Sequence, residues 1–108
     1  MANNYKFTGV ALATSSETTL LTAAADTTVV IRSIRVTNNT SNTPTISLDV
    51  ADNSASAEYT ILRTQTLSAN TAVELLSVPL ILEESDALKA TMSSTDSTHI
   101  GISYLVIS

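Results

Sequence analysis

Short apolar runs separated by polar clusters form the dominant pattern of this chain. β-Branched and aliphatic residues gather in these runs, and clusters of Asn, Ser, Thr and Asp interrupt them about every ten residues. This spacing is typical of an all-β protein, and no stretch has the period of a helix of useful length. Strands are predicted over residues 5–12, 17–22, 28–38, 58–65, 72–76, 78–82, 87–92 and 99–107, and Pro44 opens one further strand at a position that suits a sheet edge.

The strand that follows Pro44 has the clearest alternation. Ile46, Leu48 and Val50 point to one face, and the polar residues between them point to the other. Seven to nine such strands in 108 residues predict one domain, residues 1–108, built as an antiparallel two-sheet β-sandwich of the jelly-roll or immunoglobulin-like type. The residues expected in its core are Ile34, Val36, Ile46, Leu48, Ile61, Leu75, Leu88, Ile102 and Tyr104.

The predicted strand 28–38 breaks its own alternation at Arg32. In a regular strand Arg32 would share the core face with Ile34. A β-bulge at Arg32 and Ser33 would remove the conflict. The alternative is an arginine that reaches over the sheet end toward a carboxylate such as Asp49 or Glu74.

The balance of polar residues suggests a surface that is partly covered. Charged residues make up 14% of the chain and hydrophobic residues 44%, so Ser and Thr supply much of the polarity. One interpretation is a hydroxyl-rich β surface. The favoured one is a homo-oligomer, because the centres of subunit interfaces are depleted in charge. With only two glycines, the turns are expected to use Asn and Asp for left-handed geometry.

Charge and composition exclude several classes of partner and site. The net charge is −5, and the five basic residues are scattered, which argues against binding to nucleic acid or to an anionic membrane. There is no cysteine for a disulfide or a thiolate metal site. The N-terminus lacks the pattern of a secretory signal and no apolar run is long enough to cross a bilayer, so we expect a complete, non-exported, soluble gene product.

The chain offers little catalytic chemistry. His99 is its only histidine, and no serine lies in a Gly-x-Ser-x-Gly motif. A Ser-His-Asp arrangement with Asp96 can be drawn, but a solvent-facing histidine at the start of a strand is the simpler interpretation. We therefore expect no enzyme and no cofactor.

Binding of metals and glycans finds equally weak support. One histidine is too few for a zinc or non-haem iron site. Residues 83–86, and Asp49 with residues 52–53, carry oxygen ligands for Ca²⁺, but neither segment is an EF-hand loop and solvated acidic turns are the favoured interpretation. Glycan binding would need aromatic platforms, and the chain has no Trp; a receptor- or glycan-binding module stays as an alternative that would use Tyr5 and Tyr59.

Three segments resemble a known class of protein. They are residues 4–12 (NYKFTGVAL), residues 30–38 (VIRSIRVTN), and residues 78–91 (VPLILEESDALKAT) followed by IGISYLVI at 100–107. Together they resemble small virion structural proteins of tailed bacteriophages, particularly phages of cyanobacteria and other marine bacteria. Ser85 departs from the common form, in which a Gly precedes the Asp, and this leaves the turn type open.

The resemblance implies a β-sandwich without catalytic residues that decorates a capsid or belongs to a tail. The expected function is a decoration or cement protein that stabilises the assembled shell; a tail, neck or fibre module is the alternative. The expected partners are the major capsid protein or tail proteins and further copies of the chain, with a trimer favoured, in a virion assembled in the host cytoplasm. Because termini and long loops often carry contacts, the candidate interface residues are Tyr5, Lys6, Phe7, Asn38, Asn39, Thr40, Ser41, Asn42 and Thr43.

Overall fold

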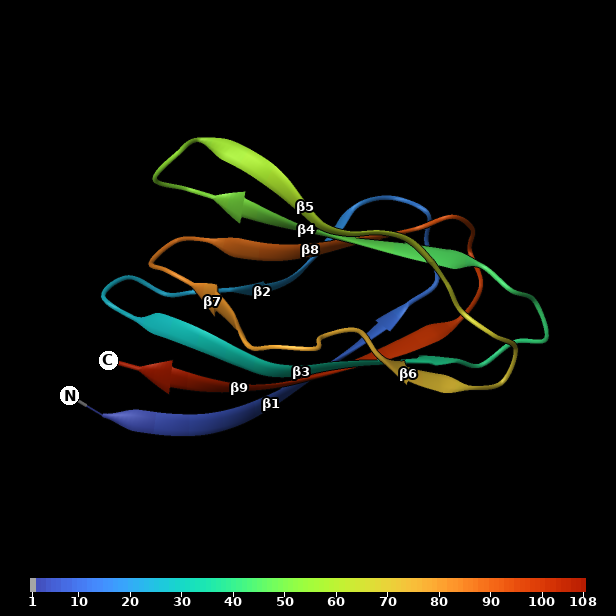
Figure 1. The fold of residues 1–108 in the computed structure, drawn as a ribbon, viewed down its shortest axis with the longest axis horizontal. Helices are drawn as coiled ribbons and strands as arrows, with labels where there is room; N and C mark the ends of the chain where they lie inside the picture. Colours follow the sequence, from blue (N-terminus) through green and yellow to red (C-terminus); the bar gives the residue numbers. More distant parts are fainter. Residues whose placement is uncertain (1) are drawn as a thin grey trace.

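A computed structural model describes residues 2–108 as two antiparallel sheets packed face to face (Figure 1). The strands are β1 (Asn3–Leu12), β2 (Thr18–Thr22), β3 (Thr28–Asn38), β4 (Thr45–Asp52), β5 (Ala57–Thr66), β6 (Ala72–Glu74), β7 (Leu80–Leu82), β8 (Ala87–Met92) and β9 (Thr98–Ile107). Each predicted strand is present within a few residues, and the predicted two-sheet sandwich is confirmed. Within residues 2–108 no helix is long and apolar enough to span a membrane.

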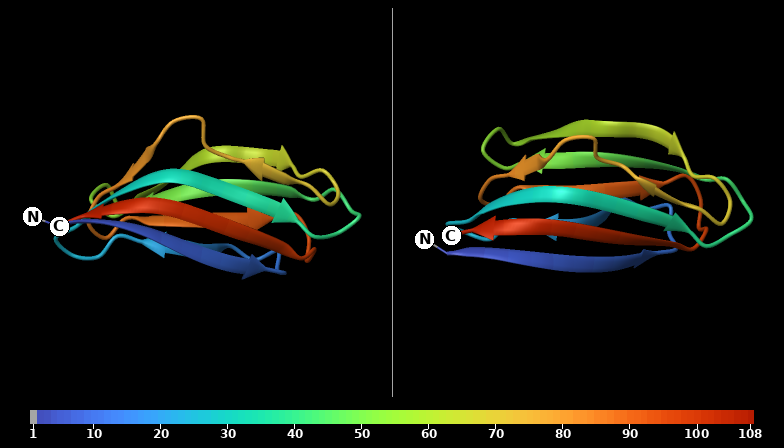
Figure 2. Two further views of the ribbon diagram at one scale, coloured as in Figure 1. Left: turned by 90° about the horizontal axis from the view of Figure 1, so that it is seen from below. Right: turned by 60° about the horizontal axis from the view of Figure 1, so that its bottom comes forward.

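Sheet A has the order β1-β9-β3, and both β6 and β7 pair with the free side of β3. Sheet B has the order β2-β8-β4-β5. Figure 2 shows that β1 and β2 lie on one lateral side of the sandwich, whereas β5, β6 and β7 lie on the opposite side. The two ends of the described chain meet, because Ala2 and Ser108 exchange two backbone hydrogen bonds of 2.9 Å.

The bulge predicted in β3 is confirmed. The register between β3 and β9 shifts between Ile31 and Ser33, so Arg32 is the extra residue and its side chain is exposed. Glu74 supports the bulge, since its carboxylate accepts hydrogen bonds from the Ser33 hydroxyl and, at 2.7 Å, from the Ile34 N–H. Glu74, which was one of the carboxylates considered as a partner of Arg32, therefore accepts hydrogen bonds from the two residues that follow Arg32.

The core contains seven of the nine predicted residues, and two predictions are corrected. Ile61 is 43% exposed, and Leu75 is only partly buried at the margin of the core. Ile61 lies on β5, the edge strand of sheet B, where two register shifts against β4 interrupt the alternation. The buried hydrophobic residues are Leu12, Leu20, Ala23, Val29, Ile31, Ile34, Val36, Ile46, Leu48, Val50, Leu67, Leu82, Leu88, Ala90, Met92, Ile100, Ile102 and Tyr104.

Within residues 2–108, five residues have left-handed backbone and none of them is glycine; four lie in turns, and Thr64 lies inside β5. Asp26 and Asn70 follow the prediction for Asp and Asn, and Ser56, Thr64 and Ser85 join them. Both glycines have ordinary negative φ and lie inside strands. Neither glycine is therefore required by the backbone conformation, and what matters is the side chain that lies over them.

Replacing Ser85 by glycine is expected to stabilise the protein by up to about 1 kcal/mol. Ser85 has φ 69° in an exposed turn, a conformation that costs an L-residue about 1–2 kcal/mol, and the added freedom of the unfolded chain offsets part of the gain. Urea unfolding measures the change. The control is Ser97→Gly, at an exposed residue without positive φ, which should lose stability; an equal loss in both variants would contradict the prediction.

Candidate functional site

The N-terminal candidates lie on an open edge of the sandwich. Tyr5, Lys6 and Phe7 belong to β1, which is the outermost strand of sheet A. Tyr5 is 77% exposed and Phe7 69% exposed, and both alternate onto the outer face. Lys6, between them, lies beside Leu21 and Tyr104 at the side of the sandwich. The β1 edge thus presents two aromatic rings to solvent.

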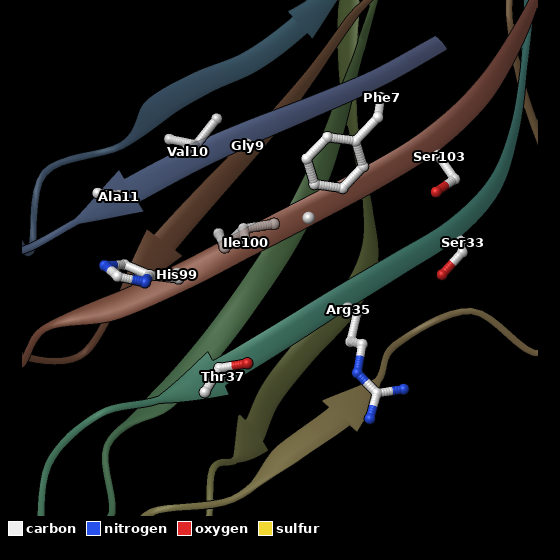
Figure 3. A pocket seen from close by; sticks show the side chains of 11 residues that line it. Phe7, Gly9, Val10, Ala11, Ser33, Arg35, Thr37, His99, Ile100 and Ser103 are labelled. Atoms are coloured by element: carbon white, nitrogen blue, oxygen red, sulfur yellow. The ribbon is translucent and has the colours of Figure 1, made fainter. Parts of the chain in front are cut away.

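Phe7 lies over the two glycines of the protein. A Cβ atom built on Gly101 would come within 3.0 and 3.2 Å of the Phe7 ring, and one on Gly9 within 3.5 Å. The ring occupies the space that side chains of β1 and β9 would otherwise fill, as aromatic residues do over glycines in sheets (Figure 3). Phe7 is therefore positioned by the sheet and exposed at the same time, which suits an anchor for a partner.

Beside Phe7 the outer face of sheet A is hollowed. The hollow has a volume of about 520 Å³ and crosses β1, β9 and β3 (Figure 3). Its polar groups are the Arg35 guanidinium, the His99 imidazole and the hydroxyls of Ser33, Thr37 and Ser103. His99 is exposed at the start of β9, as predicted. An apolar floor with one cation and no carboxylate among its lining residues suits binding better than proton transfer.

The second group of candidates, residues 38–43, divides into one buried residue and an exposed loop. Asn38 is 1% exposed, so its side chain is removed from the candidate interface. Its amide donates to the carbonyl oxygens of Asn42, Leu67 and Ser68, and its Oδ1 accepts from the N–H and hydroxyl of Thr40. The buried Asn38 thus holds two loops together from inside.

The rest of this segment is available to partners. Asn39, Ser41, Asn42 and Thr43 are exposed, and Thr40 is half-buried. Asn42 donates to Asp96 at 2.8 Å, and hydrogen bonds from Ser94 and Asn42 lower the pKa of Asp96. Asp96 therefore braces this loop, and these hydrogen bonds do not connect it with the imidazole of His99.

Two carboxylates of the acidic turns considered as cation sites accept hydrogen bonds within the protein, namely those of Asp86 and Asp52. The two carboxylate oxygens of Asp86 accept hydrogen bonds from the N–H groups of Asn53 and Glu83, at 3.0 and 2.9 Å. Asp52 accepts from Ser54 and Ala55 within its own turn. These two carboxylates therefore fasten turns.

A different acidic cluster lies on sheet B. Carboxylate oxygens of Glu17, Asp49 and Glu58 lie within 4.8 Å of one another. The Lys89 ammonium stands 3.7 Å from Glu17 and 4.0 Å from Glu58, where it offsets part of the negative charge. The hydrogen bond with Glu17 is the main cause of the raised pKa of Glu58, and partial burial adds to it. The cluster is best understood as a surface ion-pair network.

The large exposed hydrophobic residues lie on two opposite sides of the sandwich. Tyr5 and Phe7 are on β1, Tyr59 and Ile61 on β5, and Val78 and Ile81 in or beside β7 (Figure 2). The candidate interface residues predicted from the sequence include the first side, whereas on the second side only Tyr59 was named for binding, as part of the glycan-binding alternative. One signal was present: in the unbroken run 80–82 the middle residue of a strand with a single core face must point outward.

Comparison with known proteins gives a fold and no family. No family model matches the chain, and no curated protein matches it. Among solved structures it is similar to the core of Drosophila NLP, with a TM-score of 0.54 and 20% identity over 94% of this chain and 98% of that one. The NLP-core structure provides insight into pentamer formation and histone binding by that protein. At this level of identity the similarity concerns the fold.

Proposed function

We propose that this chain is a structural protein of a tailed-bacteriophage virion, which binds the assembled shell as a decoration or cement protein. The observation that carries the proposal is the placement of its exposed hydrophobic residues on two opposite sides of a charge-poor sandwich. β1 is a long open edge strand with two exposed aromatic rings, and monomeric proteins avoid such edges because these pair with other chains. Small virion proteins resemble this chain in residues 4–12, 30–38 and 78–107. We therefore propose that the edges are covered by neighbouring proteins of a virion.

The proposed stabilisation of the shell depends on many copies of the chain binding at equivalent sites. A small rigid domain that docks at many equivalent sites on a shell adds one interface at each site, and together these raise the barrier to opening. Stiff β-strands and a positioned Phe7 lose little conformational freedom on docking. We propose a homo-oligomer with the major capsid protein as partner, a trimer being favoured by the threefold sites of icosahedral shells. Pentamer formation by the NLP core supports the use of this fold as a subunit of a closed oligomer.

A tail, neck or fibre component remains the second candidate, with tail proteins as partners. Its copy number separates it from a decoration protein, since a shell carries hundreds of sites and a tail ring about a dozen copies. Quantitative mass spectrometry of purified virions is expected to find hundreds of copies of this chain per particle. About a dozen copies would assign it to the tail or neck, and its absence from virions would overturn the proposal.

A further inference from the structure

We propose that copies of this chain associate side by side, with β1 of one copy against the β7 side of the next. The β1 edge is defined as residues 3–12, and the β7 edge as residues 77–84. This inference deepens the proposed function and rests on it in one respect, namely that the chain works as a homo-oligomer. It adds the surface that joins the copies.

A row of apolar side chains crosses the outer face of sheet A from one edge to the other. Tyr5 is paired with Leu105, Leu105 with Val30, and Val30 with Ile81. Leu105 and Val30 are half-buried, whereas the two terminal members, Tyr5 and Ile81, are exposed. If β1 of one copy adjoins β7 of the next, Ile81 and Tyr5 become neighbours and the row continues across the junction.

The strand directions allow this junction. The pairs β1·β9, β9·β3 and β3·β7 are all antiparallel, so β1 and β7 run in opposite directions at the two sides of sheet A. When the next copy is related by rotation about an axis along the strands, its β1 adjoins β7 in the antiparallel sense. With Tyr5 of one copy beside Ile81 of the next, Phe7 comes to lie beside residues 78–79 of that next copy, where Val78 is exposed.

The charges favour unlike edges over like edges. Lys6 is the single charged residue of β1, whereas Glu83 and Glu84 are both exposed immediately after β7. Pairing β1 with β1 would bring two lysines together, and pairing the β7 edges would gather four glutamates. Pairing β1 with β7 brings opposite charges to one junction.

Apart from Lys6, the β1 edge lacks the features that protect other edges of this protein. Its ten residues keep an unbroken register against β9 and contain no proline. By contrast, β5 is interrupted by register shifts, β2 is short and has a bulge, and β7 has three residues with Pro79 before it. A head-to-tail junction covers β1, and when the rotation closes it produces a ring.

Two single substitutions and their mixture test the junction. Tyr5→Asp places a charge on the β1 edge, and Ile81→Asp places one on the β7 edge. Light scattering after size-exclusion chromatography is expected to show an oligomer for the wild type and monomers for each variant alone. The mixture is expected to give a one-to-one heterodimer, because one intact β1 edge and one intact β7 edge remain to form a single junction. Phe7→Asp serves as a second β1 variant, and Thr91→Asp, on the outer face of the central strand β8, is the control that keeps the wild-type mass.

Other results would overturn the inference. If Ile81→Asp stays a dimer while Tyr5→Asp is a monomer, β1 pairs with β1 of another copy. If two variants that remain folded by circular dichroism keep the wild-type mass, the edges do not join the copies, and a monomeric wild type excludes the junction altogether. Hundreds of copies in purified virions would then still support the proposed function, so the two failures are distinguishable.

Discussion

Replacing Asn38 by alanine is expected to lower the free energy of unfolding by about 3–4 kcal/mol, since several buried or partly buried polar groups lose their partner at once. The Asn38 side-chain NH2 donates to the carbonyl oxygens of Asn42, Leu67 and Ser68, and its Oδ1 accepts a hydrogen bond from the N–H of Thr40. Alanine satisfies none of these groups and leaves a small cavity. Urea unfolding followed by far-UV circular dichroism measures the loss.

Asn42→Ala is the matched control, because it changes the same residue type in the same loop. The Asn42 side chain is exposed and donates one hydrogen bond to Asp96, so its loss should cost less than about 1 kcal/mol. Asn38→Asp distinguishes hydrogen bonding from packing, because it keeps the volume and the acceptor for Thr40 but removes the donor to three carbonyls. If the free energy of unfolding of the Asn38→Ala variant lies within about 1 kcal/mol of that of the Asn42→Ala variant, the hydrogen bonds of Asn38 do not hold the two loops together.

Local pattern was sufficient to predict the strands and the bulge. Alternation in residues 46–50 defines a core face by itself. The conflict at Arg32 indicated either an extra residue in β3 or an arginine that reaches over the sheet end, and the structure has the extra residue. Both inferences depend on residues that are neighbours in sequence. The turn at Ser85 illustrates the limit: the sequence indicated a turn, and the structure was needed to assign its left-handed backbone.

Features set by sheet order were not predictable from one sequence. Asn38 stands in a run of Asn, Thr and Ser that looks like a solvated loop, and its burial follows from residues 67–68 lying against it. The outer position of Ile81 became significant only once β7 was found at the side of the sandwich opposite β1. The candidate site thus depends on long-range placement, whereas the fold class depends on local periodicity.

The hollow beside Phe7 adjoins the proposed junction and shares Phe7 with it, and it extends from there over sheet A. It lies on the outer face of sheet A, and its lining residues come from β1, β9 and β3. A lateral junction leaves this face open when copies form a ring.

Ile34→Ala is expected to lower the free energy of unfolding by about 3–5 kcal/mol, while Ile61→Ala should cost less than about 1 kcal/mol. Ile34 is fully buried in the central strand β3, opposite Ile102 of β9, and the surrounding strands have little room to close the cavity. Ile61 was predicted to share that core, but the edge strand β5 leaves 43% of it in solvent.

The pair removes the same atoms from two isoleucines, so the difference between them reports chiefly their difference in burial. Urea unfolding of both variants is the measurement, and m-values equal to that of the wild type are required for the comparison. Equal losses of several kcal/mol would place Ile61 inside the core, as its sequence pattern suggested, and would contradict the position of β5 at the edge of sheet B. A small loss at Ile61 together with a lowered mass of the oligomer would instead indicate that its exposed side chain is covered by another copy, because in the monomer it has little contact to lose.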